Sequence, residues 1–276
     1  MSRKRWALFV VQAALLALPA GCAAPAKLSR AEIPVRLEES ASLELAGPAV
    51  AICPDRGRLV LLESSGARLV VLDSALTPVD TIPLTTRLAA PRGVAADRFY
   101  FYAYDDEVLY RALKNDLVLK PWVSRVYVAG LAGYAAGEML VSDDERSAVW
   151  YKTIFGESRR FLDATAASDP GPIVSLPEGM FCVLDQGRRL VFFNRAGIVT
   201  RAVRLAGFHN LMASDETGAL YLTGSGSNRI TRVSDKGQLV CELVRVKGVE
   251  GIATLPGRLV VLDSGARVAV YPLSSF

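Results

Sequence analysis

The chain has 276 residues, of which 51% are hydrophobic and 22% are charged, so it is long enough to bury one large core. Its formal net charge is +4, but three of its 32 basic residues are Arg3, Lys4 and Arg5, and the other 29 nearly balance the 28 acidic residues. Because no basic cluster with interleaved aromatic residues is present, the composition argues against a nucleic-acid partner.

Residues 1–21 have the layout of an export signal. Three basic residues are followed by an apolar run, Trp6 to Leu18, that is too short to span a bilayer comfortably. The run ends in Pro-Ala-Gly-Cys at residues 19–22, which resembles a bacterial lipobox, in which the cysteine becomes the lipidated first residue. Pro19 departs from the aliphatic residue that is usual at its position. The pattern predicts a lipoprotein signal peptide over 1–21 and lipidation of Cys22.

The predicted anchor also sets the expected location. Ala23 follows the cysteine in place of an aspartate, which favours the outer membrane, facing the periplasm. The acyl chains would hold the protein firmly, because each buried methylene contributes about 0.8 kcal/mol. The alternative is ordinary cleavage after Ala26, which would release a free secreted protein. Residues 22–34 are predicted to be the lipidated cysteine and a short polar tether.

A phrase with a period of about 40 residues recurs six times after the tether. Its clearest copy, residues 257–271, reads GRLVVLDSGARVAVY. The acidic or turn residue that closes the first half of the phrase recurs at Glu63, Asp105, Asp143, Asp185, Gly224 and Asp263. Such a period, with several short strands in each unit, is typical of a β-propeller. The sequence therefore predicts an all-β, six-bladed propeller over residues 35–276.

Short apolar runs separated by turn residues define the strands within each repeat. In the first repeat, predicted strands cover 50–52, 58–62, 68–72 and 81–84. The six blades are expected to begin near Gly47, Pro91, Tyr127, Gly171, Phe208 and Val249. Runs such as residues 259–262 are continuously apolar, as expected of strands that neighbouring blades cover on both faces.

The last blade has only three predicted strands before the chain ends at Phe276. A spare strand, Val35 to Leu45, precedes the first blade. We expect this strand to complete the last blade and close the ring, because an open ring would expose unpaired backbone at its edges.

The repeats resemble the NHL type of propeller. Residues 262–271, LDSGARVAVY, are similar to the core of that repeat, and residues 91–97 and 225–230 are similar to other parts of it. The likeness covers about residues 35–273 and is weakest in blades two and three, where Glu107 and Ser147 replace an arginine. The resemblance implies the fold and little about activity, since such propellers include binding platforms, scaffolds and a few enzymes.

Two recurring features have a structural explanation. Acids that end one strand precede arginines near the start of the next, so each pair is expected to bridge its own hairpin. The pairs are Glu63 with Arg68, Asp143 with Arg146, Asp185 with Arg189, and Asp263 with Arg267. Apart from Cys22, the cysteines are Cys53, Cys182 and Cys241, which we expect to be buried free thiols.

Residues that differ between blades at one aligned position are the candidates for ligand binding. Alignment places Arg92, Asn210 and Glu250 at the start of the innermost strand of their blades, and His209 is adjacent to Asn210. Pro48 and Gly171 occupy the same position in blades one and four. Such positions ring the mouth of the central channel, where Arg92, His209, Asn210 and Glu250 could bind a small polar ligand or a divalent ion. The alternative is that they are solvated loop residues without a shared target.

Aromatic residues concentrate in blade two, where most are expected in the core and Tyr102 or Tyr104 could reach a rim. Trp122 and Trp150 end strands of blades two and three, and this divergent side is the favoured surface for a protein partner.

The sequence favours a binding role over catalysis. Lyases of the NHL type use histidine metal ligands, and this chain has a single histidine. No Gly-x-Ser-x-Gly turn surrounds any serine, and no phosphate-binding loop is present. We therefore assign no catalytic residue, metal ligand or cofactor, and nothing specifically indicates a divalent cation such as calcium.

The sequence thus predicts an exported, membrane-anchored propeller that binds a protein, peptide or glycan at the cell envelope. The main alternative is a metal-dependent hydrolase or lyase at the channel mouth, of the gluconolactonase or NHL-lyase type. A purely structural subunit of an envelope assembly is a third possibility.

Overall fold

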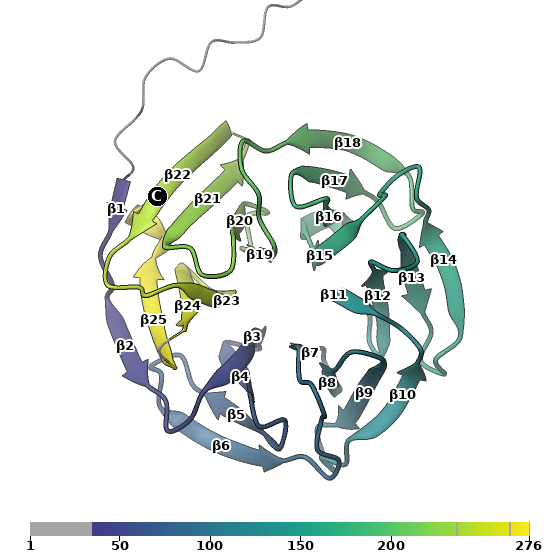
Figure 1. Ribbon diagram of the computed structural model, residues 1–276, viewed down its shortest axis with the longest axis horizontal. Helices are drawn as coiled ribbons and strands as arrows, with labels where there is room; N and C mark the ends of the chain where they lie inside the picture. Colours follow the sequence, from purple (N-terminus) through teal and green to yellow (C-terminus); the bar gives the residue numbers. More distant parts are fainter. Residues whose placement is uncertain (1–34, 236, 265, 276) are drawn as a thin grey trace, which may run out of the picture. The chain divides into compact units, whose positions relative to one another are not determined.

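Six β-sheets are arranged around a central axis in the computed structural model, which describes residues 35–235, 237–264 and 266–275 (Figure 1). This arrangement confirms the predicted all-β, six-bladed propeller. The only helical elements in the described part are two short 3-10 turns, η1 (Pro177–Gly179) and η2 (Leu273–Ser275). Neither could cross a membrane as a helix. The predicted signal peptide, Cys22 and the tether lie outside the described residues.

Each blade is built on four antiparallel strands, which in blades one to five follow one another along the chain from the channel outwards. Blade one consists of β3 (Ala49–Asp55), β4 (Arg58–Glu63), β5 (Arg68–Leu72) and β6 (Pro78–Pro83). Blade two consists of β7 (Gly93–Ala96), β8 (Tyr100–Tyr104), β9 (Val108–Leu113) and β10 (Lys120–Ser124). Blade three consists of β11 (Val128–Ala135), β12 (Glu138–Asp143), β13 (Ala148–Lys152) and β14 (Ser158–Leu162).

The remaining blades follow the same plan. Blade four consists of β15 (Pro170–Ser175), β16 (Phe181–Asp185), β17 (Arg189–Phe193) and β18 (Val199–Arg204). Blade five consists of β19 (Leu211–Ser214), β20 (Leu220–Thr223), β21 (Arg229–Ser234) and β22 (Gly237–Leu243). Blade six takes β23 (Val249–Leu255), β24 (Arg258–Asp263) and β25 (Arg267–Pro272) from the end of the chain.

The apolar core lies between neighbouring blades. In β24, the five residues after Arg258 are all buried, because the sheets on either side cover both faces of the strand. The three cysteines of the described part, Cys53, Cys182 and Cys241, are buried free thiols, as predicted. Burial raises the pKa of each thiol, and that of Cys241 reaches about 11.

The N-terminal segment closes the ring, but it does so as two strands and not as the single strand predicted over Val35–Leu45. β2 (Ala41–Glu44) pairs with β25 and supplies the fourth strand of blade six, as predicted. β1 (Val35–Leu37) instead pairs in parallel with β22 and adds a fifth strand to blade five. The segment therefore ties two blades together, and both strands lie at the outer edge of the ring (Figure 1).

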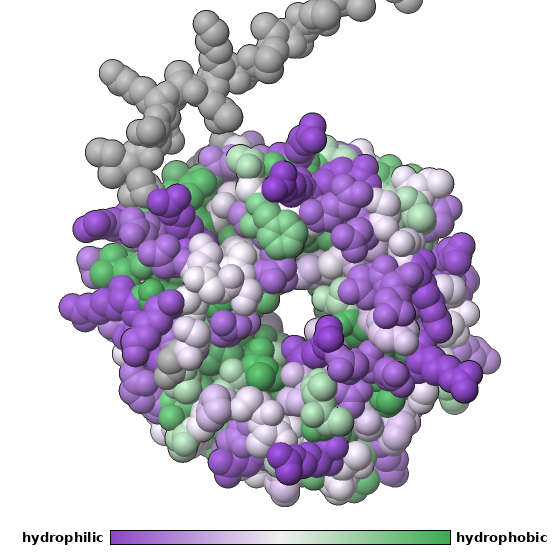
Figure 2. All heavy atoms as spheres, in the orientation of Figure 1, coloured by the Kyte–Doolittle hydropathy of each residue, from purple (hydrophilic) through white to green (hydrophobic). Residues whose placement is uncertain are grey.

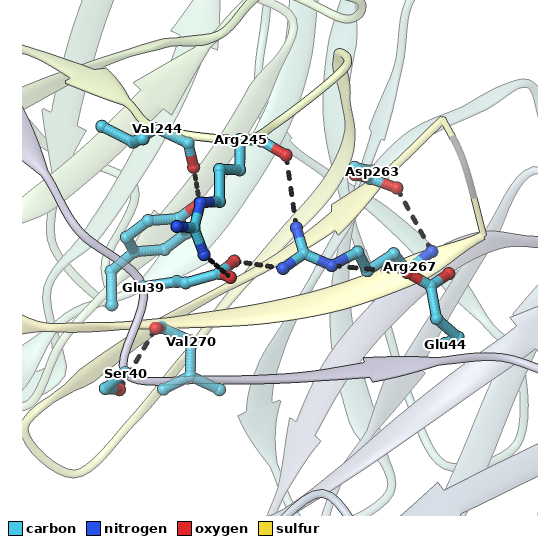
Figure 3. A network of polar contacts seen from close by, with 9 residues as sticks. Glu39, Ser40, Glu44, Val244, Arg245, Asp263, Arg267 and Val270 are labelled. Carbon is cyan, nitrogen blue, oxygen red and sulfur yellow. Dashed lines mark hydrogen bonds and ion pairs between the residues drawn. The ribbon is translucent and has the colours of Figure 1, made fainter.

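Polar contacts hold this segment against both blades (Figure 3). The Glu39 carboxylate forms ion pairs with Arg267 of blade six and, at 3.5 Å, with Arg245, which follows blade five. Arg267 also lies 3.6 Å from a Glu44 carboxylate oxygen and donates a hydrogen bond to the carbonyl of Arg245. Ser40 donates its backbone N–H to the Val270 carbonyl at 2.8 Å. A single carboxylate thus connects strands from opposite ends of the chain.

Three of the four predicted acid–arginine pairs form within their own hairpins, whereas Arg267 of blade six forms its ion pairs elsewhere. Arg68 pairs with Glu63 at 2.6 Å and Arg189 with Asp185 at 2.8 Å, while Arg146 lies 3.7 Å from Asp143. In blade six the Arg267 backbone N–H donates to Asp263, but the guanidinium forms its ion pairs with the N-terminal segment (Figure 3). The repeated arginine therefore has a second role where the ring closes.

Deletion of residues 35–45 should abolish sharp cooperative melting. The deletion unpairs the outer edges of β22 and β25 and removes Leu37, which is 1% exposed. Loss of the Leu37 side chain alone, in Leu37→Ala, should cost about 2–5 kcal/mol of unfolding free energy. Both effects are measured by thermal and denaturant unfolding followed by circular dichroism.

The matched control is Val35→Ala on the same strand, because Val35 is 41% exposed and its loss should cost less than about 0.5 kcal/mol. A deletion variant that unfolds as sharply and at the same temperature as the parent would contradict the observed closure.

Candidate functional site: the channel mouth

The innermost strands of the six blades surround a central channel. They are β3, β7, β11, β15, β19 and β23. We call the side of the ring where these strands begin the mouth face, and the side where they end the far face. The channel opening is visible near the centre of the ring, and strongly hydrophilic residues cover much of the surface around it (Figure 2).

The ladders between first and second strands define equivalent positions in all blades. The first position, which we call the mouth ring, is occupied by Val50, Arg92, Ala129, Gly171, Asn210 and Glu250. Three polar residues predicted to share a position therefore do share it. Arg92, Asn210 and Glu250 line one cavity of about 470 Å³. Their role in binding a ligand stays a prediction.

A β-bulge explains how several of these side chains face the channel. The ladder skips one residue between Ala49 and Ala51, and again between Val249 and Gly251, so that Val50 and Glu250 lie on the bulges. A bulge changes the direction of a side chain relative to the strict alternation of a strand. Pro48, aligned with this position in blade one, is instead two residues earlier, where its carbonyl accepts a hydrogen bond from Ser64.

One turn of blade five connects two of the polar residues. The Ser225 backbone N–H donates to Asn210 Oδ1 at 2.7 Å, and the Ser225 hydroxyl donates to Glu250 Oε2 at 3.1 Å. These bonds leave the Asn210 amide N–H groups and the second Glu250 oxygen available for a ligand. Ser225 was not singled out as a site residue by the sequence, because its place between two strands marks it only as part of a hairpin turn.

The third polar residue lies beside an aromatic side chain on blade two. Arg92 forms an ion pair with Asp106. Tyr104, which pairs with Gly93, lines the same cavity, as one of the two predicted rim tyrosines, whereas Tyr102 is fully buried. Its ring needs a glycine beneath it, because a Cβ on Gly93 would lie 2.0 Å from Tyr104 Cζ.

Burial raises the pKa of Tyr104 to about 12, although nearby Arg92 acts in the opposite direction. The phenol is therefore a neutral hydrogen-bonding group at neutral pH.

An apolar constriction lies below the mouth ring. The third position of the inner strands, which we call the belt, is occupied by Ile52, Val94, Leu131, Ile173, Met212 and Ile252. All six residues line both the mouth cavity and a second cavity of about 290 Å³ towards the far face. The mouth cavity therefore has a polar rim and an apolar floor, an arrangement typical of sites for small amphipathic groups.

Hydroxyl groups link neighbouring blades at the far end of the channel. Ser175 donates to the Gly133 carbonyl at 2.8 Å, Ser214 to the Ser175 carbonyl at 3.0 Å, and Thr254 to the Ser214 carbonyl at 2.5 Å. These bonds join blades three to six in sequence. These hydroxyl groups thus form hydrogen bonds between blades, whereas Asn210 and Glu250 at the mouth ring keep hydrogen-bonding groups available for a ligand.

His209 does not belong to the mouth cavity, in contrast to the placement predicted from sequence adjacency. It occupies the position equivalent to buried Val249, one residue before the mouth ring, and is 8% exposed. It lines a separate cavity of about 320 Å³ on blade five, together with Phe208 and Arg229. Its Nδ1 is buried without a hydrogen-bond partner among the described residues. Burial lowers the pKa of the imidazole.

The described residues offer no ready metal centre. In this part of the chain, no three His, Cys, Asp or Glu side chains are grouped so that they could hold a metal ion. Arg111 and Arg160 lie over the rings of Trp122 and Trp150 at 4.8 and 5.3 Å, and the use of this side by a protein partner stays a prediction.

Comparison with solved structures identifies many propellers. The chain is similar to virginiamycin B lyase from Staphylococcus aureus, with 13% identity and a TM-score of 0.62 over 84% of this chain and 98% of that one. It is also similar to the WD40 β-propeller domain of Doa1, with 10% identity and a TM-score of 0.62 over 82% and 80% of the chains. A chain of a nidogen/laminin complex is 17% identical, with a TM-score of 0.62 over 75% and 85%.

Identities this low show the fold alone. No family model and no curated protein matches the sequence, so the assignment to the NHL type stays a prediction.

Replacement of His209 by valine, the residue at the equivalent position of blade six, should reduce the acid sensitivity of the fold. The folded-state pKa of His209 is lowered, so below the unfolded pKa of about 6.5 the unfolded chain takes up a proton that the folded chain does not. Stability is therefore lost as the pH falls from 7.5 to 5.5, and His209→Val should lose less. For each kcal/mol of unfolding free energy that the variant retains and the parent loses, the melting temperature of the variant should fall by about 2–4 °C less.

The parent and variant are melted at both pH values, so that the carboxylates common to both cancel in the comparison. An equal fall in melting temperature for the two proteins would show that His209 is not held neutral by burial.

Proposed function

We propose that this protein is an exported, membrane-anchored binding module whose channel mouth receives a peptide segment of another envelope protein. The observation that carries the proposal is the shared position of Arg92, Asn210 and Glu250 around one cavity with an apolar floor. Propellers that carry variable residues on a rigid ring are suited to binding, since loops and strand ends can vary without changing the fold.

The chemistry of the mouth cavity fits a peptide. Asn210 retains amide N–H donors for a peptide carbonyl, and Glu250 retains an acceptor for a peptide N–H, because Ser225 uses only one oxygen of each side chain. The belt below offers an apolar surface for one side chain of the peptide. A glycan would be held less well, since sugar rings usually need aromatic surfaces and Tyr104 is the only aromatic residue of this lining.

Space for such a ligand comes from the other three positions of the mouth ring. Val50, Ala129 and Gly171 are small at the positions where blades two, five and six carry long polar side chains. A chain could therefore enter over Ala129 and Gly171 of blades three and four and meet Asn210 and Glu250 of blades five and six.

The location of the protein is proposed from sequence alone. The basic start, the apolar run and Cys22 support lipidation and placement at the outer membrane, facing the periplasm. The membrane would then be one partner and the envelope protein that supplies the peptide the other.

A metal-dependent hydrolase or lyase fits the described residues less well, because they provide no cluster of three metal-ligating side chains at the mouth. The likeness to virginiamycin B lyase concerns the fold and brings no catalytic group to this chain.

Asn210→Ala and Glu250→Ala should each weaken peptide binding by about tenfold, since each removes a hydrogen bond made in a partly enclosed site. The probe is a fluorescein-labelled heptapeptide selected from a random library against the purified protein, and its affinity is measured by fluorescence anisotropy. The control is Asn228→Ala, which removes an exposed amide of the same blade that bonds Glu242. Unchanged affinity in both mouth variants, or failure to select any peptide, would refute the proposal.

Cys22→Ser should move the protein out of the membrane fraction. Lipidation needs the thiol, and without acyl chains nothing in the proposed anchor remains. Mass spectrometry of the N-terminal peptide should find acylated Cys22 in the parent, and density-gradient fractionation should place it with the outer membrane. An unmodified N-terminus at Lys27 would instead show ordinary cleavage after Ala26.

A further inference from the structure

Exposed apolar side chains are distributed unequally between the two faces of the ring. Ten large apolar residues are exposed in the described part of the chain. Six of them form what we call the far-face patch, on turns or strand ends at the far face of blades two to four: Phe99, Leu113, Ile154, Phe155, Ile198 and Val199. By contrast, Phe208 is the exposed apolar residue in a connection on the mouth face.

The most exposed member of the patch lies on a hydrogen-bonded turn. Phe155 is 85% exposed and lies between β13 and β14, where Thr153 and Gly156 close a hydrogen-bonded turn. Arg111 donates to the Ile154 carbonyl at 2.7 Å, and its guanidinium lies between the rings of Tyr100 and Trp122, 4.8 Å from each. The scaffold therefore fixes the position from which Phe155 projects into solvent.

Two other members are presented in a similar way. Asp97 accepts hydrogen bonds from the backbone N–H groups of Phe99 and Tyr100, both at 2.7 Å. Asn194 accepts from the N–H of Ile198 at 3.0 Å. Arg98, exposed, lies over the Phe99 ring at 5.3 Å. Several large apolar side chains exposed on one face of the ring, beside basic or polar groups, are suited to contact with an apolar partner.

The path of the chain indicates which partner this is. β1 runs in the same direction as β22, which proceeds from the far face towards the mouth face, so Val35 is at the end of β1 nearer the far face. Twelve residues separate Val35 from Cys22. Fully extended, the chain from Cys22 to Val35 spans at most about 45 Å, so a lipid at Cys22 would keep the ring close to the bilayer.

We propose that the far-face patch rests on the phospholipid surface and that the channel mouth faces away from the membrane. The proposal rests on the lipid anchor of the proposed function. The patch consists of separate side chains on turns of three blades, and such tips can each enter the boundary between headgroups and acyl chains. A second protein copy would need a continuous complementary surface, whereas a bilayer accepts separated tips.

The arrangement assigns different tasks to the two faces. The lipid holds the protein at the membrane, the far-face patch sets the orientation of the ring, and the mouth cavity then opens towards the periplasm. A peptide from a soluble or protruding envelope protein would reach Asn210 and Glu250 without passing between the ring and the bilayer.

Tryptophan quenching by brominated phospholipids tests the orientation. The full lipidated protein, as the variants Phe155→Trp and Phe208→Trp, is placed in vesicles of brominated phosphatidylcholine and phosphatidylglycerol, and the parent signal of Trp122 and Trp150 is subtracted. Both substituted side chains are highly exposed, so folding should be preserved, and melting curves check this. Because interfacial side chains lie about 5–10 Å deep, emission at position 155 should be quenched at least about twofold more than at 208.

Flotation of the same samples separates the two proposals. Protein that floats with the vesicles but is quenched equally at both positions, or more strongly at 208, would overturn the orientation and leave the anchor standing. Protein that does not float would overturn the anchor and the orientation together. Loss of peptide binding in the mouth variants does not affect the quenching, so that test fails or succeeds independently.

Discussion

The contact on which this structure depends is the one that joins the two ends of the ring. Glu39 lies between Arg267 of blade six and Arg245 after blade five, while Leu37 and β2 bury apolar surface and pair the outer edge beside it. A propeller without such a closure would expose two sheet edges and an uncovered blade. The buried Leu37 side chain and the ladder of β2 stabilise this closure, whereas the ion pair of the exposed Arg245 with Glu39 contributes modestly.

Closure also determines the channel. Inner strands approach one another so closely that a Cβ on Gly130 would lie 2.8 Å from Ile173 N, and one on Gly251 would lie 2.9 Å from Ile52 Cγ2. Small residues at this level let the belt residues just beyond converge and divide the channel into two cavities. The polar mouth and its apolar floor therefore exist only because six blades are held at this spacing.

The two faces of the ring then differ in chemistry. At the mouth, Ser225 orients Asn210 and Glu250 and leaves part of each side chain available for a ligand. At the opposite end, the hydroxyl groups of Ser175, Ser214 and Thr254 donate hydrogen bonds to neighbouring blades. The far face carries exposed Phe155 on a turn that Arg111 fixes. The ring therefore has a polar mouth on one side and exposed apolar side chains on the other.

The sequence alone was enough to predict the six blades and their closure by an N-terminal strand, because both follow from the repeat period. It was also enough to predict the buried cysteines and the common position of Arg92, Asn210 and Glu250, which follow from the alignment of the repeats and from their apolar pattern. The direction of each mouth side chain was decided by the tertiary structure. His209 lines a cavity of blade five although its neighbour Asn210 lines the channel mouth, as the alternation of an extended chain requires. In blade one a bulge interrupts this alternation and places Val50 in the mouth ring, where alignment had placed Pro48. The belt and the split of the closing strand likewise depend on how blades pack, and packing between distant segments leaves no periodic signal in a single sequence.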